Sequence, residues 1–175
     1  MPISVMIADD HPIVRDGIKS AIHSREQDII IVAEAANGQE LLEMAQVVKS
    51  DVYVIDVMMP VLNGLETLKR LLKLKEDARV IMLSVYDTRE YVEKALLFGA
   101  RGYVLKDENT SGIVKAIREV AGGGFYLSPR VANFIIEGFV SRVTREGKIR
   151  GLTDREREIL QLLAEGLSSK EVAER

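Results

Sequence analysis

The strongest constraint on the fold is an alternation that repeats five times along residues 3–121. Each time, a short run of apolar residues is followed by a segment with apolar residues at helical spacing. The expected strands are almost continuously apolar and occupy residues 3–8, 29–35, 52–56, 79–85 and 102–106. Such strands are typical of parallel sheets, because helices cover both faces of those sheets. The alternation therefore predicts an α/β fold with a five-stranded, parallel, doubly wound sheet.

Helices are expected after each strand. The apolar positions of the first helix are Ile13, Gly17, Ile18, Ala21 and Ile22. The second helix has a capping-box start, because Asn37 is followed three residues later by Glu40. Thr88 is the expected N-cap of the fourth helix.

The sequence changes character after residue 121, which predicts three parts. Residues 1–121 form the sheet domain, residues 122–150 a linker, and residues 151–175 the start of a helical domain. The linker begins with three glycines, and Ser128-Pro129 opens a short helix in it before a polar, basic stretch at 140–151. Thr153 and Ser168 each begin a capping box, so two short helices are expected in the last part.

Composition excludes several classes of site. The chain has 175 residues, no cysteine and two histidines, which excludes disulfides, thiol catalysis, cysteine zinc sites and multi-histidine metal centres. The net charge of −3 argues against a surface built mainly for nucleic acid. No apolar stretch approaches the roughly 20 residues of a membrane span. No signal peptide is visible, so we expect a cytoplasmic protein without a membrane partner.

Polar side chains follow four of the five expected strands. Asp9 and Asp10 follow the first strand, Asp56 ends the third, and Ser84 and Lys106 lie at the ends of the fourth and fifth. Taken singly, each has an ordinary explanation, such as a helix cap, a turn residue or a solvated lysine. Because the carboxyl ends of parallel strands share one edge of the sheet, we expect them to converge.

Three carboxylates in one crevice repel one another unless a cation lies among them. An incomplete set of oxygen ligands favours Mg²⁺, which keeps several waters and accepts a phosphate as partner. Lys106 and Ser84 supply the donors that a phosphoryl oxygen needs.

Four stretches resemble the receiver domain of two-component response regulators, which has a flavodoxin-like fold. They are ADD, VIDVMMPVLNG, MLSV and GARGYVLK, and the resemblance covers residues 1–121. The resemblance implies that Asp56 is the phosphoacceptor and that Mg²⁺ is held by Asp9, Asp10, Asp56 and the backbone carbonyl of Met58. It implies that Lys106 pairs with the phosphate. It also implies that Ser84 is the switch hydroxyl and Tyr103 the switch aromatic. Asp107 stands where many receivers have proline.

The resemblance further implies phosphoryl transfer from the phosphohistidine of a sensor histidine kinase to Asp56. Such a chain phosphorylates itself and hydrolyses its own acyl phosphate, but it is not an enzyme that turns over a substrate. Phosphorylation would change the surface of the fourth helix, the fifth strand and the fifth helix.

Residues 151–175 resemble the opening of the helix-turn-helix domain of NarL/FixJ (LuxR-type) regulators, with Ser169 where that family usually has asparagine. The resemblance implies truncation before the recognition helix, so DNA binding and control of transcription are expected of the full-length protein only. Homodimer formation on phosphorylation stays open.

One alternative is a stand-alone receiver that signals only through protein contacts. A phosphatase of the dehalogenase type is excluded, because it would need aspartate at Met58. A flavodoxin-like electron carrier would need a hydroxyl-rich loop where Asp9 and Asp10 stand.

Overall fold

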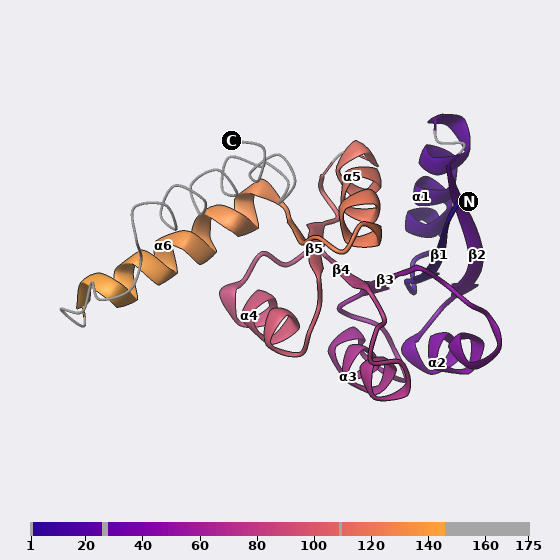
Figure 1. The fold of residues 1–175 in the computed structure, drawn as a ribbon, viewed down its shortest axis with the longest axis horizontal. Helices are drawn as coiled ribbons and strands as arrows, with labels where there is room; N and C mark the ends of the chain where they lie inside the picture. Colours follow the sequence, from indigo (N-terminus) through magenta and orange to yellow (C-terminus); the bar gives the residue numbers. More distant parts are fainter. Residues whose placement is uncertain (1, 26–27, 109, 146–175) are drawn as a thin grey trace.

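A parallel sheet with helices on both faces forms the body of the molecule (Figure 1). The computed structural model describes residues 2–25, 28–108 and 110–145. The sheet has six strands in the order β2-β1-β3-β4-β5-β6, and every pairing is parallel. The strands are β1 (Ile3–Ala8), β2 (Ile29–Ala35), β3 (Val52–Asp56), β4 (Val80–Ser84), β5 (Gly102–Leu105) and β6 (Tyr126–Leu127). The predicted fold class is confirmed.

Two apolar layers bury the faces of the sheet. Helices α2 (Gly38–Val47), α3 (Gly64–Leu74) and α4 (Arg89–Leu97) cover one face, with Leu41, Leu68 and Val92 among the buried side chains. Helices α1 (Pro12–Arg25) and α5 (Thr110–Ala121) cover the other, with Ile22 and Ile117 buried. Figure 1 shows the two groups of helices on opposite sides of the strands. Burial of these apolar stripes is the main force that holds the layers together.

The starts of two helices follow the sequence signals. The Asn37 side chain accepts a hydrogen bond from the Glu40 backbone N–H at 3.0 Å, and the Glu40 carboxylate accepts from the Ala36 N–H at 2.8 Å. This is the expected capping box with one difference. The Glu40 carboxylate bonds the N–H of the residue before the N-cap and not that of the N-cap itself. Thr88 stands at the N-cap of α4, but its side chain makes no capping hydrogen bond.

Three features differ from the expectations. The two-residue strand β6 adds a sixth strand next to β5. The helix after Ser128, α6, runs from Pro129 to Arg145. It is therefore longer than the short helix expected in the linker, and it continues into the polar, basic stretch that begins at residue 140. Ile13 is 81% exposed at the start of α1, and the buried stripe of that helix runs through Ile18 and Ile22 instead.

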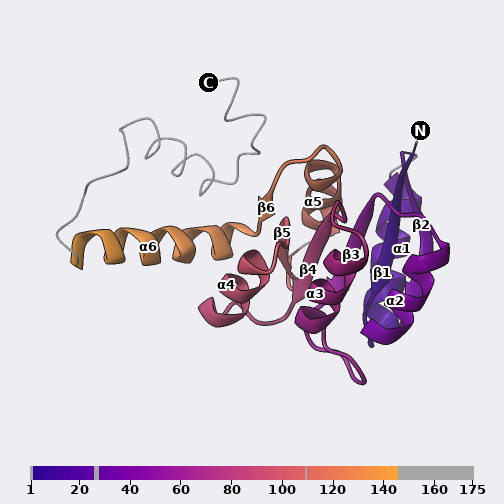
Figure 2. The same ribbon diagram turned by 60° about the horizontal axis from the view of Figure 1, so that its bottom comes forward.

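Helix α6 leaves the body beside α4 and projects away from the sheet (Figure 2). Among the described residues, no helix has both the length and the apolar character needed to cross a bilayer. The capping boxes expected at Thr153 and Ser168, and with them the whole of residues 151–175, lie outside the described residues.

The order of the strands places a crevice at one edge of the sheet. The chain moves outward from β1 to β2 and then returns to the other side of β1 to form β3. Ligands of open α/β sheets bind at the carboxyl ends of the strands beside such a reversal. Asp9 follows β1 and Asp56 ends β3 at this point, so both carboxylates lie where the fold predicts a site.

Candidate functional site

One lysine joins two buried carboxylates at the carboxyl edge of the sheet. The Lys106 Nζ lies 2.7 Å from Asp9 Oδ2 and 2.8 Å from Asp56 Oδ2. Asp9 is fully buried and Asp56 is 3% exposed. Lys106 follows β5, which is two strands away from β3, so its long side chain reaches across the end of β4. The expected convergence of these three residues is therefore present.

The loop after Asp56 is shaped to hold that residue in place. Gly64 opens α3 so close to β3 that a Cβ atom there would lie 2.0 Å from the Asp56 backbone oxygen. The Gly64 N–H also donates to the Val57 carbonyl at 2.9 Å. Between them, Val61 adopts a φ of 66°, a left-handed conformation that is costly for a β-branched residue. Strained backbone of this kind is found preferentially at functional sites.

The electrostatics of the three central groups are coupled. Burial raises the pKa of Asp56, and the nearby Asp9 charge adds to that effect, while the hydrogen bond from Lys106 opposes it. For Lys106, burial by itself lowers the pKa, but hydrogen bonds to Asp56 and Asp9 outweigh it and leave the pKa raised. One cation thus partly compensates two buried anions, which leaves an excess of negative charge.

A cluster of four side chains can hold a metal ion here. The ligand atoms of Asp9, Asp10, His11 and Asp56 lie within 4.8 Å of one another. Carboxylate oxygens next to an excess negative charge suit a hard divalent cation. The His11 Nδ1 lies 2.8 Å from Asp10 Oδ1, so Asp10 stands at the rim of the cluster with the imidazole. The role expected for the Met58 carbonyl stays a prediction.

Ser84 and Tyr103 are connected through one loop. Ser84 ends β4, is buried, and accepts a hydrogen bond from the Tyr86 N–H at 2.9 Å. The Tyr103 hydroxyl donates to the Tyr86 carbonyl at 2.8 Å, and its ring is fully buried. Burial raises the pKa of Tyr103, so the hydroxyl stays protonated and able to donate. A change at Ser84 can therefore reach Tyr103 through the backbone of Tyr86, and also directly, because the side chains of Ser84 and Tyr103 are hydrogen-bonded.

Sequence reasoning missed two neighbours of the central aspartates. His11 donates its backbone N–H to Asp9 Oδ1 at 2.8 Å, and Arg15 donates to the Asp9 backbone oxygen at 2.5 Å. Arg15 Nε also lies 3.4 Å from a Glu34 carboxylate oxygen on β2. The run Asp9-Asp10-His11 was a usable signal, since an imidazole directly follows two acids, whereas nothing local to Arg15 indicates its partners.

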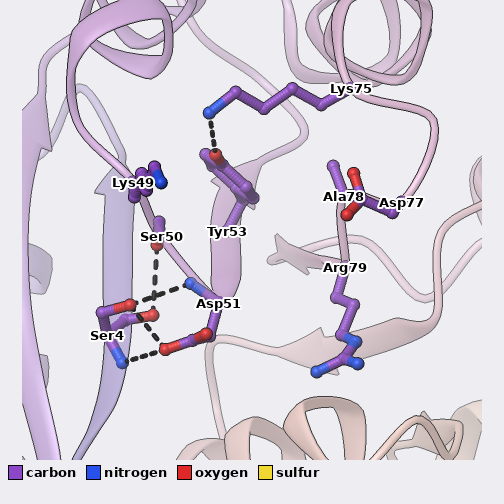
Figure 3. A pocket seen from close by; sticks show the side chains of 9 residues that line it. All are labelled: Ser4, Lys49, Ser50, Asp51, Tyr53, Lys75, Asp77, Ala78 and Arg79. Atoms are coloured by element: carbon purple, nitrogen blue, oxygen red, sulfur yellow. Dashed lines mark hydrogen bonds between the residues drawn. The ribbon is translucent and has the colours of Figure 1, made fainter.

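A cavity of about 540 Å³ lies at the opposite edge of the sheet, where the strands begin (Figure 3). Several of its polar groups are already paired with one another. The Asp51 carboxylate accepts from the Ser4 hydroxyl at 2.6 Å, and Lys75 Nζ donates to the Tyr53 hydroxyl at 3.3 Å. The first bond ties the start of β1 to the start of β3, and the second ties the end of α3 to β3. Both lie at the edge of the sheet opposite Asp56, so the cavity is separate from the site described above.

Comparisons with known proteins agree with this geometry. Residues 5–118 match the model of the response regulator receiver domain, and residues 150–175 match that of bacterial regulatory proteins of the luxR family. The chain is 38% identical over 175 residues to the nitrate/nitrite response regulator protein NarL of Escherichia coli, covering 99% of this chain and 81% of that protein. The chain belongs to the LuxR family of two-component response regulators.

Other relatives of this response regulator point the same way. It is 38% identical over 172 residues to the transcriptional regulatory protein MctR of Rhizobium johnstonii, covering 98% of this chain and 78% of that protein. Its fold resembles a LuxR-family response regulator from an Aurantimonas species, with a TM-score of 0.76 and 30% identity over 80% of this chain and 99% of the other. It also resembles the receiver domain of a regulator from Mycobacterium tuberculosis, with a TM-score of 0.66 and 32% identity over 70% and 98% of the two chains.

Proposed function

We propose that this response regulator accepts a phosphoryl group on Asp56 from the phosphohistidine of a sensor histidine kinase. The observation that carries the proposal is the buried Asp56 carboxylate, which ends β3 beside Asp9 and is bonded to Lys106 at 2.8 Å. An isolated carboxylate at this depth would be costly, but a nucleophile needs an environment that excludes water and supplies one cation.

The chemistry is an in-line displacement at phosphorus. A carboxylate oxygen of Asp56 forms the new P–O bond, the P–N bond to the kinase imidazole breaks, and the imidazole leaves with a proton from solvent. Mg²⁺ is the proposed cofactor, held by Asp9, Asp10, Asp56 and the Met58 carbonyl, and when bound it offsets the charge of carboxylates and phosphoryl oxygens. One phosphoryl group is taken up per chain, and hydrolysis of the same acyl phosphate resets the protein.

The remaining polar groups of the site orient the phosphoryl group. Lys106 already lies within bonding distance of Asp56, so its ammonium group is placed to pair with an added oxygen. Ser84 accepts from the Tyr86 N–H and its hydroxyl also bonds the Tyr103 side chain, so donation to a phosphoryl oxygen would require the hydroxyl to leave Tyr103. Lys106 is bonded to Asp56 before transfer, which reduces the reorganisation that the reaction needs, whereas Ser84 has to shift to reach a phosphoryl oxygen.

The proposed output begins in the loop that follows Ser84. A shift of Ser84 toward a phosphoryl oxygen would disturb its bond with Tyr86, and the Tyr86 carbonyl is the acceptor of Tyr103. The Tyr86 ring also stacks on Tyr91 of α4, with the ring centres 5.8 Å apart. A local event at Asp56 can thus alter the surface formed by α4 and β5.

Control of transcription is the proposed purpose of this change. The support is the luxR-family match at residues 150–175 and the names of relatives such as the transcriptional regulatory protein LnrK of Bacillus subtilis, 34% identical over 181 residues. The same match disfavours a stand-alone receiver. DNA is therefore a proposed partner besides the kinase, and homodimer formation on phosphorylation is a further proposal. The cytoplasm is the proposed compartment, because ATP-derived phosphoryl groups are available there.

Intact-mass analysis after incubation with Mg²⁺ and acetyl phosphate tests the proposal. The wild-type chain should gain one phosphoryl group, and Asp56→Asn should gain none because the nucleophilic oxygen is lost. Asp51→Asn is the matched control, since Asp51 precedes the same strand at the opposite edge of the sheet. Chelation of Mg²⁺ with EDTA should suppress the gain. Phosphorylation of Asp56→Asn to the wild-type level would refute the assignment.

A further inference from the structure

A single arginine of α6 joins two loops that flank the site. The guanidinium of Arg130 donates to Asp107 Oδ2 through one terminal nitrogen and to Asp87 Oδ2 through the other, both at 2.5 Å. Asp87 lies in the loop between β4 and α4, and Asp107 in the loop between β5 and α5. Arginine suits this arrangement because its planar fork can bond two carboxylates at once. We name the three side chains the Arg130 bridge.

The two bridged loops begin beside the donors of the site, since Ser84 is the last residue of β4 and Lys106 is the first residue after β5. Asp87 is three residues after Ser84, and Asp107 directly follows Lys106. The first loop is also held by the bonds of Tyr86 to Ser84 and Tyr103. The separation of the Ser84 loop from the Lys106 loop is therefore set at one end by the sheet and at the other by Arg130.

The backbone under Arg130 is firmly attached to the sheet. The Ser128 N–H donates to the Tyr103 carbonyl at 2.9 Å, and the Ser128 hydroxyl accepts from the Leu105 N–H at 2.9 Å. Val131, the next residue after Arg130, is fully buried in the same core cluster as Tyr103. The guanidinium is consequently presented to the two loops from a defined position at the start of α6.

We propose that Arg130 is a positioning residue for phosphoryl transfer, which holds the Ser84 and Lys106 loops at the separation of the unphosphorylated chain. The inference rests on the proposed function of Asp56. A phosphoryl group on Asp56 draws Ser84 and Lys106 toward new oxygens, so the loops leave the arrangement that fits the bridge. The bridge therefore opposes phosphorylation. By linkage, phosphorylation in turn weakens the hold of the loops on the start of α6.

The size of the effect is bounded by exposure. The side chains of Arg130, Asp87 and Asp107 are 63%, 46% and 64% exposed, so solvent and salt screen the bridge. Exposed ion pairs contribute little, and a change of roughly two- to threefold in rate is the expected scale.

The test measures the initial rate of phosphorylation at Asp56 by intact mass, with Mg²⁺ and acetyl phosphate below saturation. Arg130→Gln should be phosphorylated roughly two- to threefold faster than wild type. Arg130→Lys should also be faster, because a single ammonium group keeps the charge but does not span both carboxylates. Arg118→Gln is the matched control, since Arg118 pairs with Asp28 away from the site, and its rate should equal that of wild type.

Salt and a second set of variants separate positioning from a general structural effect. The ratio of the Arg130→Gln rate to the wild-type rate should fall toward one at about 0.5 M KCl, because salt opens the bridge in the wild type. The double variant with Asp87→Asn and Asp107→Asn should be phosphorylated at the same rate as Arg130→Gln. The triple variant that also carries Arg130→Gln should show no further change in rate.

The possible failures are distinguishable. Absence of label on Asp56 in the wild type would refute the proposed function itself. Normal labelling of the wild type, with Arg130→Gln equal to Arg118→Gln or slower, would refute the role of Arg130 alone. A rate ratio that does not change with salt would also refute it.

Discussion

At the scale of residues, the site consists of one cation shared by two buried anions. Lys106 bonds both Asp9 and Asp56. Its single positive charge would nearly balance the negative charge of one of these carboxylates, but it does not balance both. Buried charges without full compensation lower the stability of the folded state. The protein therefore carries a local cost at Asp56, of a kind expected where function rather than stability has selected a residue.

This cost predicts that Asp56→Asn stabilises the protein at neutral pH. The pKa of Asp56 is raised in the folded state. Its contribution to the stability of the folded state is therefore fully present below the unfolded pKa and is lost as the pH rises through the folded pKa. In EDTA at pH 7, Asp56→Asn should raise the free energy of unfolding by about 1 kcal/mol. The difference should shrink as the pH falls toward about 4. Urea titrations across this range give the measurement.

Asp51→Asn is a control with the opposite sign. Hydrogen bonds from Ser4 lower the pKa of Asp51, so its contribution is present at neutral pH and is lost as the pH falls through the lowered pKa. Asp51→Asn should therefore destabilise the protein at pH 7 and have less effect in acid. An Asp56→Asn variant that is less stable than wild type at pH 7 would contradict the proposed imbalance of charge.

Residues of the site were predictable from sequence only where the fold itself brings them together. Asp9, Asp56 and Lys106 follow apolar strands, and parallel strands end at one edge, so their meeting required no knowledge of side-chain geometry. Arg15 and Arg130 lie on helices, where either could equally face solvent. Their partners depend on how those helices dock, and no local pattern encodes that.

At the scale of elements, length decided what could be predicted. The five long strands were recognised because each has a continuous apolar run, whereas β6 has only two residues, Tyr126 and Leu127, and no period to detect. Helix α6 extends to Arg145 through residues that are mainly polar or basic, which favoured a linker on composition. The exposure of Ile13 has a similar origin, since spacing alone does not say which of several apolar residues faces the sheet.

The junction of β3 and α3 gives a sharp prediction at this scale. Gly64→Ala places a Cβ atom 2.0 Å from the Asp56 backbone oxygen, so either the strand end or the start of α3 must move. We expect a loss of about 2–3 kcal/mol in unfolding free energy, the upper range for overpacking. Phosphorylation by acetyl phosphate should slow as well, because Asp56 is displaced from Lys106. Urea unfolding and intact mass measure the two effects.

Gly17→Ala is the matched control. Gly17 lies in α1, and a Cβ atom there would meet nothing within 4 Å. Alanine favours a helix over glycine by about 0.5–1 kcal/mol, so this variant should be more stable than wild type. Its phosphorylation should be unchanged. If Gly64→Ala were tolerated as well as Gly17→Ala, close approach of α3 to β3 would not be what positions Asp56.

At the scale of the whole molecule, the folded unit of the receiver extends past residue 121. Strand β6 pairs with β5, and the Tyr126 N–H donates to the carbonyl of Arg101, the residue before β5, at 3.0 Å. Val131 of α6 is buried in the core on the face covered by α4, and Ala132 is buried as well. The first two turns of α6, through Ile135, therefore pack against the same core as the site, while the far end of the helix projects away (Figure 2).

This arrangement predicts that a chain ending at Ala121 is less stable than one ending at Glu137. The shorter chain loses the burial of Val131 and Leu127 and exposes β5 as an edge, for an expected loss of about 3 kcal/mol. The longer chain retains β6 and two turns of α6, so its urea midpoint should match that of the chain ending at Arg145. Equal midpoints for all three chains would mean that β6 and the start of α6 add nothing to the fold. In that case Arg130 would have no fixed support from which to hold the two loops.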